Sequence, residues 1–272
     1  LGFYNTKEVY FNHSNWIADI SFDYFGFTVP INTKSVLGFN ITSVTMDDME
    51  VTRYGNEETG ETFNASDYAF GSTYSINLTD RFSVGLNSKY IQQTISNSHA
   101  KGFALDIGTL FMTPFGFKLG TSISNFGQKL KMTGDDLLIG ADVDENMDGN
   151  NESVTSVLST DYFDLPLVLR IGLSSELGLG VSNQFVWSLD AISPNDNNNY
   201  INAGVCLHLS DKLLSFYAGY SSLFLKNKER ELAIGISLKI PKVLNNSLKI
   251  YYSYETMKFL GNNQQLAISL NY

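Results

Sequence analysis

The residues of this chain best suited to metal chemistry lie in one acidic, asparagine-rich segment, 142–152. Side-chain oxygens recur there at alternate positions before a glycine, as in the first half of a calcium-binding loop, where the oxygens converge on the ion and the glycine permits a sharp turn. Thr155 stands where such a loop carries its bidentate glutamate, and Glu152 is the nearest substitute. Acidic, asparagine-rich loops are usually just solvated, and the alternative is a Ca²⁺ site that stiffens the segment. The candidate ligands are Asp144, Asn146, Asp148 and Glu152, with Gly149 at the turn.

The histidines do not form a catalytic pattern. His13, His99 and His208 are far apart in the sequence, and the chain contains neither a Gly-x-Ser-x-Gly elbow nor metal-type histidine spacing. A lipase acting at a lipid boundary needs a paired Ser and His, and we interpret His13 instead as an interfacial polar residue beside Trp16. Gly178-Leu179-Gly180 lacks the third glycine and the following helix of a nucleotide-binding turn. We therefore predict no catalytic residue and no enzymatic activity.

The overall composition excludes further classes of protein. The formal net charge is -10, whereas nucleic-acid binding requires a basic face. No run approaches the roughly 20 apolar residues of a membrane-spanning helix. Yet 15 Tyr and 19 Phe are many for 272 residues, and membrane β-barrels concentrate aromatic residues at both interfaces. The single Cys206 excludes an internal disulfide, and we expect it to be an inert thiol.

The elements that position these residues are predicted to be β-strands, because apolar and polar residues alternate in segment after segment. Period-two alternation puts every second side chain on one face of a strand. In the last segment, 264–272, one face is apolar and the other polar, so one face suits lipid and the other suits water. Most segments have about the 9 to 11 residues that a tilted strand needs to cross the hydrocarbon layer. The predicted strands are 16–29, 35–44, 68–78, 81–92, 102–112, 116–125, 165–175, 183–192, 200–209, 214–222, 231–240, 247–256 and 264–272.

Short turns and longer polar loops alternate strictly between these strands. Outer-membrane barrels show this alternation, with short periplasmic turns and long extracellular loops, and bacterial single-chain barrels have an even number of strands. We therefore assign 7–12 as a further first strand, which places both ends of the chain on one side. The prediction is a single domain over 1–272: an all-β, transmembrane, antiparallel up-and-down barrel of about 14 strands, with long extracellular loops near 45–67 and 126–164.

A set of charged residues within the predicted strands tests this assignment. Its members lie on the face opposite to the bulky apolar series, so we expect them to face an enclosed polar lumen. A charge facing the middle of the bilayer costs about 2 to 4 kcal/mol, which makes a one-residue error of register prohibitive. The set comprises Lys89, Asp106, Lys118, Arg170, Asp190, Lys239, Lys249 and Glu255.

Several ordered motifs carry a resemblance to a known family. They are Glu8-Val9-Tyr10-Phe11-Asn12-His13, Trp16-Ile17-Ala18-Asp19-Ile20, Thr62-Phe63-Asn64-Ala65-Ser66-Asp67, Thr79-Asp80-Arg81-Phe82-Ser83-Val84-Gly85, Ala104-Leu105-Asp106-Ile107-Gly108-Thr109, Ile123-Ser124-Asn125-Phe126-Gly127 and Leu165-Pro166-Leu167-Val168-Leu169-Arg170-Ile171-Gly172-Leu173. In this order and spacing, over nearly the whole chain, the sequence resembles the PorV/PorQ family of outer-membrane proteins. That family is similar in fold to the fatty-acid transporter FadL.

The resemblance implies a FadL-like barrel of fourteen strands in the outer membrane and a role in the type IX secretion system of Bacteroidota. PorV members of the family bind secreted cargo as it leaves the translocon and pass it to the surface-attachment machinery. Members usually begin with a Gly/Ala-rich segment that ends in a motif like Trp-Asn-Pro-Ala-Gly-Leu. Nothing here matches that segment, so we expect the family's N-terminal plug to be missing from this chain.

Apolar residues in the predicted extracellular loops are candidate anchors for a protein partner. Acidic residues cluster in the same loops, where they suit either a docking surface or contact with lipopolysaccharide through divalent cations. The candidate anchors are Leu223, Phe224, Leu225, Tyr54 and Phe63, of which the first three are equally suited to face lipid. The predicted function is binding of the type IX translocon and secreted cargo. The alternatives are a FadL-like channel for hydrophobic small molecules and a structural or adhesin-anchoring barrel.

Overall fold

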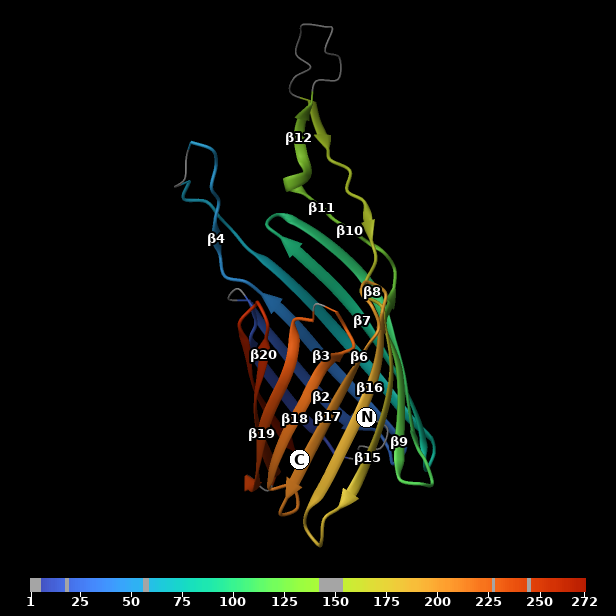
Figure 1. Ribbon diagram of the computed structural model, residues 1–272. Helices are drawn as coiled ribbons and strands as arrows, with labels where there is room; N and C mark the ends of the chain where they lie inside the picture. The colour runs from blue at the N-terminus through green and yellow to red at the C-terminus, as the bar shows by residue number, and fades with distance from the viewer. Residues whose placement is uncertain (1–5, 18–19, 56–58, 142–153, 227, 244–245) are drawn as a thin grey trace, which may run out of the picture.

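The computed structural model describes residues 6–17, 20–55, 59–141, 154–226, 228–243 and 246–272. Within these residues, fourteen strands pair in antiparallel fashion into one closed barrel (Figure 1). The ring closes because β1 pairs with β2 on one side and with the last strand, β21, on the other. The prediction of a fourteen-stranded all-β barrel, including the short first strand, is confirmed. The barrel strands are β1 (Glu8–Asn15), β2 (Ser21–Pro30), β3 (Ser35–Thr45), β6 (Ala65–Thr79), β7 (Phe82–Ile95), β8 (Ser98–Met112), β9 (Phe117–Gly127), β15 (Val168–Gly178), β16 (Gln184–Pro194), β17 (Tyr200–Leu209), β18 (Leu214–Leu223), β19 (Arg230–Val243), β20 (Asn246–Met257) and β21 (Asn262–Asn271).

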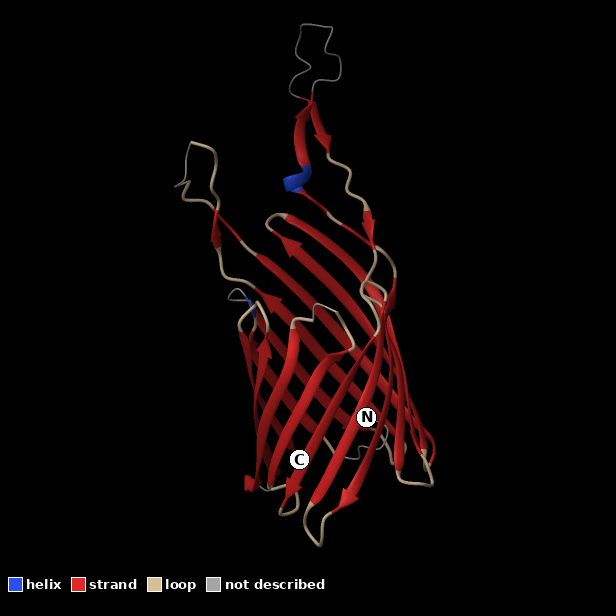
Figure 2. Ribbon diagram, in the orientation of Figure 1, coloured by secondary structure: helices blue, strands red, loops and turns tan. Residues whose placement is uncertain are grey.

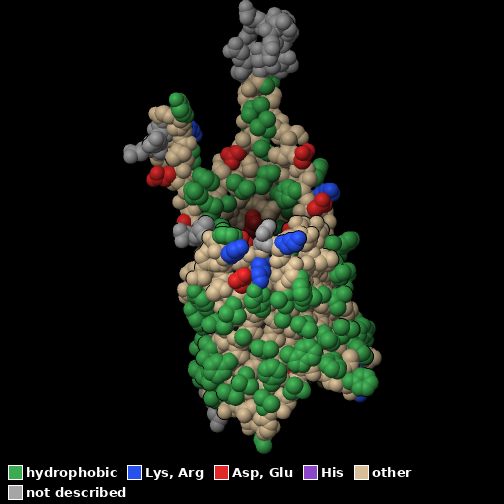
Figure 3. All heavy atoms as spheres, in the orientation of Figure 1, with side chains coloured by type: hydrophobic (Ala, Val, Ile, Leu, Met, Phe, Trp, Pro, Cys, Tyr) green, Lys and Arg blue, Asp and Glu red, His purple; other side chains and the backbone are tan. Residues whose placement is uncertain are grey.

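The outer wall of the barrel is a continuous apolar belt, which covers the visible lower face in Figure 3. Closure leaves no strand edge, so the backbone donors and acceptors of the wall are paired and the barrel can cross a bilayer. Residues of the belt are widely exposed, which in water would be unfavourable but in lipid is expected. Examples from different strands are Phe25, Phe39, Leu86, Ile107, Ile171, Leu189, Ile234 and Ile268.

The inner wall carries charged residues that the sequence predicted to face the lumen. Lys89 and Asp106 form an ion pair of 2.7 Å with side chains only 14% and 22% exposed. Lys239 pairs in register with Lys249, and Gly172 with Asp190, on the face opposite to the exposed apolar series. The predicted set of luminal charges therefore lies inside the barrel. No helix among the described segments is long and apolar enough to span a membrane.

Short turns lie at one end of the barrel and long loops at the other (Figure 2). Both described ends of the chain lie at the short-turn end, where the Tyr272 N–H donates to the Lys7 carbonyl at 3.0 Å. Some predicted strand ends were wrong. The strand expected from Trp16 begins only at Ser21, because the backbone turns at Trp16, whose N–H donates to the Ile20 carbonyl at 2.7 Å.

Two other boundaries differ at prolines. The strand expected from residue 165 begins at Val168, after Pro166, which has no N–H to donate to a ladder. The turn expected at Pro241 is instead the end of β19, which continues to Val243 through a register irregularity at Pro241. Proline at a strand end or bulge removes one ladder bond without interrupting the sheet.

The segment 126–164, predicted as a long extracellular loop, contains short regular elements in its described part. It forms a folded arm that stands above the barrel (Figure 1). Its elements, which all lie outside the membrane belt, are β10 (Leu130–Lys131), β11 (Thr133–Gly134), the short 3-10 helix η2 (Asp135–Leu137), β12 (Leu138–Ala141), β13 (Val154–Val157) and β14 (Tyr162–Phe163). A second loop forms a flap from β4 (Met49–Glu50) and β5 (Thr62–Phe63).

Candidate functional site

The base of the arm is anchored on the inner face of β8. Leu130, from β10, is fully buried against Ala100, Ala104 and Leu165. Leu130 Cδ2 occupies the space that a Cβ at Gly102 would take, so the missing side chain of Gly102 makes room for Leu130. Leu130 and the three residues around it form the main buried apolar cluster in the described part of the chain. The arm therefore leaves the barrel in a defined direction.

Polar contacts further up the arm reinforce that anchoring. β11 pairs with the upper end of β8, where Gly134 opposes Ser98. The Asp136 carboxylate accepts hydrogen bonds from the Asn97 backbone N–H at 2.8 Å and from the Asn97 side-chain amide at 3.0 Å. These bonds favour the charged form and hold the pKa of Asp136 below its usual value. The arm is thus fixed to the β7–β8 hairpin at two separate points.

The tip of the arm is a two-stranded ribbon with exposed apolar side chains. Leu138 lies opposite Val157, and Ala141 lies opposite Val154. Leu138 and Val157 are 47% and 67% exposed. Among the described residues no third strand pairs with β12 or β13, so the ribbon presents open hydrogen-bonding edges as well as apolar side chains. Sequence reasoning missed this surface, although the apolar triplet 137–139 within an acidic loop was a signal for it.

The flap carries two of the predicted anchors. Tyr54 is fully exposed, and Phe63 is half-buried opposite Met49 on the β4–β5 pair. Within the flap, Arg53 and Glu61 form a bidentate ion pair, with an Arg53 Nη1–Glu61 Oε1 distance of 3.1 Å. Both charged side chains are more than half exposed, so we assign the pair little energetic weight.

The other predicted anchors lie at the end of β18 and in the loop that follows it, away from the flap in the sequence. Phe224 is 86% exposed, whereas Leu223 and Leu225 are half-buried. Tyr54 and Phe63 therefore do not share one loop with the Leu223–Leu225 run. The predicted Ca²⁺ ligands Asp144, Asn146, Asp148 and Glu152 fall outside the described residues. Within the described ranges, no group of three or more His, Cys, Asp or Glu side chains is arranged to hold a metal.

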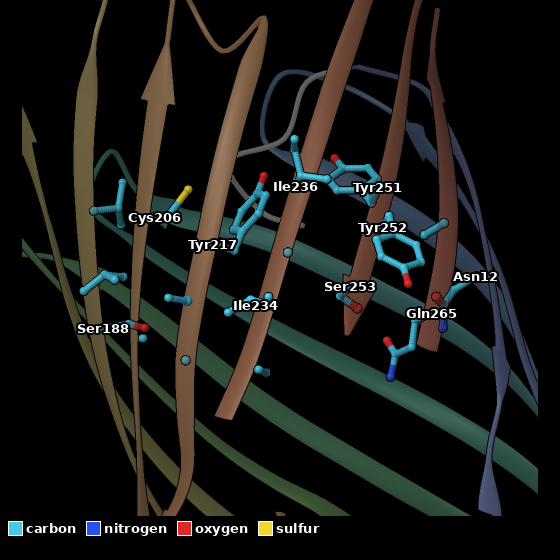
Figure 4. A pocket seen from close by; sticks show the side chains of 18 of the residues that line it. Asn12, Ser188, Cys206, Tyr217, Ile234, Ile236, Tyr251, Tyr252, Ser253 and Gln265 are labelled. Carbon is cyan, nitrogen blue, oxygen red and sulfur yellow. The ribbon is translucent and has the colours of Figure 1, made fainter. Parts of the chain in front are cut away.

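The lumen contains a cavity of about 460 Å³ against the wall formed by β16 to β21 and β1 (Figure 4). Tyr217 of β18 and Tyr251 of β20, which lie on either side of β19, extend along it, and Cys206, Ser253 and Gln265 lie around them. Gly204, Gly219 and Gly235 lie on the inner face of three consecutive strands, and their missing side chains create the space. The cavity is thus mainly apolar and aromatic, with a few polar groups at its edge.

The opposite inner wall is a network of hydrogen bonds. The Asn87 amide donates to Asp106 at 3.0 Å and accepts from the Thr73 hydroxyl at 2.9 Å. Asp106 also accepts from the Asn125 backbone N–H at 2.7 Å and pairs with Lys89. Every polar atom of the Asp106 carboxylate is therefore used within the wall, which suits a structural role better than ligand binding.

The rings of His13 and His208 are engaged in local side-chain contacts. His13 Nδ1 lies 2.8 Å from Asp23 Oδ1, and its Nε2 lies 3.1 Å from Asn15 Oδ1. Neither ring nitrogen faces a serine, as a hydrolase would require. His208 Nδ1 lies 2.8 Å from the Ser215 hydroxyl. His13 is thus paired with no nucleophile, and the Ser215 hydroxyl beside His208 belongs to a fully buried residue that a substrate would not reach.

Comparison with known proteins agrees with this architecture. No protein-family model and no curated protein sequence matches the chain. Among solved structures, a Pseudomonas aeruginosa FadL homologue is 12% identical with a TM-score of 0.55, over 98% of this chain and 88% of that chain. The Pseudomonas putida toluene transporter TodX is 8% identical with a TM-score of 0.58, over 98% and 89%. The Ralstonia pickettii toluene transporter TbuX is 9% identical with a TM-score of 0.56, over 99% and 89%. The chain therefore has the fold of a FadL-like outer-membrane β-barrel.

Proposed function

We propose that this protein binds a secreted protein partner at its extracellular end, as a carrier or anchor of the type IX secretion kind. The observation that carries the proposal is the arm, a preformed ribbon that holds Leu138 and Val157 exposed beyond the membrane belt. Exposed apolar groups outside lipid are typical of protein-interaction sites. The resemblance of the ordered sequence motifs to PorV/PorQ proteins supports the same function.

The rigidity of the arm strengthens this proposal. Binding costs less when the binding surface is already ordered, because fewer side chains and loops lose freedom on association. Leu130 and the Asp136 contacts provide that order at the base. The open edges of β12 and β13 also suit the addition of a strand from a partner, in which main-chain bonds supply affinity and side chains supply specificity.

The test is affinity purification from native outer membranes, followed by identification of the bound proteins. The double variant Leu138→Ser and Val157→Ser should lose large secreted proteins that the wild-type barrel retains. Phe115→Ser is the matched control, because Phe115 is 85% exposed but lies in a short turn at the other end of the barrel. Recovery of the wild-type barrel without a secreted partner, under conditions that preserve other outer-membrane assemblies, would refute the proposal.

A second candidate function is passage of hydrophobic small molecules, which the luminal cavity favours. Its volume of about 460 Å³ lies in the range of small-molecule sites, and four tyrosines are among its lining residues. The FadL homologue, TodX and TbuX described above share the fold. Proteoliposome uptake of toluene should then occur with the wild type and fall strongly in Ala267→Trp, which fills the cavity from β21. Equal uptake by both proteins would refute this candidate and leave the protein-binding proposal untouched.

A further inference from the structure

A pocket of about 350 Å³ opens on the outer wall near the long-loop end of the barrel. Leu169 and Ile171 of β15, Ala191 of β16 and Ile201 of β17 form its apolar lining, and Phe224 covers it from the loop after β18. Leu169 and Ile171 belong to the exposed apolar series of the belt, so the pocket faces lipid and not the lumen. Ser193 and Asn199 supply polar groups on its lining.

The backbone holds Phe224 in an uncommon conformation. Ser222 and Phe224 both have left-handed φ values, 57° and 66°, which L side chains adopt at a cost. The Ser222 N–H donates to the Asn202 side chain at 2.9 Å, and the Leu225 N–H donates to the Ser222 carbonyl at 3.2 Å. These bonds maintain a large aromatic side chain in an exposed position over the pocket. Such a position is stable where the surroundings are apolar.

Cationic side chains gather at the rim directly above this apolar belt (Figure 3). Two of them are neutralised within the protein: Arg230 pairs with Glu255 at 2.7 Å, and Lys228 lies 3.6 Å from Glu231. Lys226 and Lys258 form no ion pair with any described carboxylate. Lys226 follows Phe224 by two residues in the loop between β18 and β19. Lys258 lies in the loop between β20 and β21, and its backbone N–H donates to the carbonyl of Glu229 in the β18–β19 loop at 2.9 Å.

We propose that this rim binds one phosphorylated glycolipid of the outer leaflet, with the chemistry of lipid A. An acyl chain occupies the pocket beneath Phe224, and a phosphate lies against Lys226 and Lys258. Long basic side chains extend from apolar surface to the headgroup layer, where they attract anionic lipid. The loop that carries Phe224 to the pocket also carries Lys226, and Lys258 is hydrogen-bonded to that loop, so an apolar pocket and unneutralised cations belong to one end of the barrel, as the acyl chains and phosphates of such a lipid require. This inference is independent of the proposed protein partner and of the luminal cavity.

The test measures binding of purified lipid A to the detergent-solubilised barrel by native mass spectrometry. Phe224→Ala and the double variant Lys226→Gln and Lys258→Gln should each weaken binding at least ten-fold. Phe126→Ala and Lys101→Gln are matched controls, because both residues are exposed near the long-loop end but lie away from the pocket lining. The controls should bind as the wild type does.

Two further probes decide which part of the lipid is recognised. Lipid A without its phosphates should bind the wild type as weakly as intact lipid A binds the double lysine variant. Phosphatidylglycerol should bind at least ten-fold more weakly than lipid A. Wild-type affinity in both the Phe224 and the lysine variants would overturn the proposal, and equal affinity for phosphatidylglycerol would overturn the assignment to the outer leaflet. Melting temperatures equal to the wild type establish that the variants are folded, since Phe224 and Lys226 are exposed.

Discussion

Replacing Leu130 by alanine should release the arm without unfolding the barrel. Leu130 is fully buried between Ala100, Ala104 and Leu165, with Ile91 and Met132 packed around them. Truncation leaves a cavity that the rigid barrel wall cannot close, because Ala100 and Ala104 belong to β8. Leu-to-Ala changes at such sites cost about 2 to 5 kcal/mol. The inter-strand hydrogen bonds of the barrel are unaffected, so the loss of free energy is confined to the docking of the arm.

This cost is large compared with the other bonds at the arm base. The β10–β14 pairing joins only two residues on each side, and individual hydrogen bonds contribute about 0.5 to 1.5 kcal/mol. Since each 1.4 kcal/mol is a factor of about ten, the opening equilibrium of the arm should rise about 30-fold or more. Amide exchange in 128–141 and 154–165 should accelerate accordingly, because local opening sets its rate.

Hydrogen-exchange mass spectrometry of the barrel in nanodiscs measures this effect. Leu138→Ala is the matched control, since it removes the same atoms from an exposed position on the same arm. It should leave exchange at β10 and β14 unchanged. If Leu130→Ala changes exchange there by less than a factor of two, the buried cluster does not hold the arm, and our account of a preformed ribbon fails.

Three further predictions concern the arm base, the inner wall and the lumen. The lowered pKa of Asp136 means that its bonds to Asn97 stabilise the docked arm above the ordinary carboxyl pKa and are lost as pH falls through the lowered value. Protection of the β11 amides, expressed relative to the intrinsic exchange rate at each pH, should therefore fall on acidification in the wild type and be independent of pH in Asp136→Asn. Removing Asp106 leaves Lys89 on the inner wall without its ion pair, so Asp106→Leu should lower barrel stability in urea by about 1 to 3 kcal/mol, whereas the double variant with Lys89→Leu should recover part of the loss. Cys206 lies on the cavity lining, so a small charged thiol reagent should label it more slowly in Gly219→Phe than in the wild type, as read by mass spectrometry.

Each of these predictions has an outcome that contradicts it. An unchanged pH dependence in Asp136→Asn would exclude this carboxylate as the titrating group. A double variant no more stable than Asp106→Leu alone would show that Lys89 does not depend on its partner. Equal labelling of Cys206 in both proteins would place the thiol outside the space that Gly219 leaves open.

Thirteen strands and the orientation of their side chains were predictable from the sequence, because alternation is a local property with a period of two residues. The fourteenth, at the start of the barrel, followed from the even number of strands in bacterial barrels. The outward position of Ile107 and Ile171, and the inward position of Asp106 and Arg170, follow from the alternation directly. The starts of two strands were mispredicted because local hydrogen bonding at Trp16 and the missing N–H of Pro166 end the ladder within an alternating segment. The periodicity of the sequence does not reveal these local changes in hydrogen bonding.

The candidate sites were less predictable. The arm was missed because its order depends on Leu130 packing over Gly102, two residues that period-two alternation does not relate. Phe224 was recognised as unusual from the apolar run around it. Its pocket, however, is contributed by three other strands, and no pattern within the run indicates them.

The sequence by itself determined that this chain forms a closed sheet with a lipid-facing outside and a polar inside, since a one-residue shift would exchange the two faces. The tertiary structure alone decided where space and rigidity arise. Gly204, Gly219 and Gly235 become one cavity only when their strands are neighbours, and Leu130 becomes an anchor only when its loop folds back onto β8. Side-chain direction is set by neighbouring residues in the chain, whereas packing depends on contacts between residues that closure of the barrel brings together.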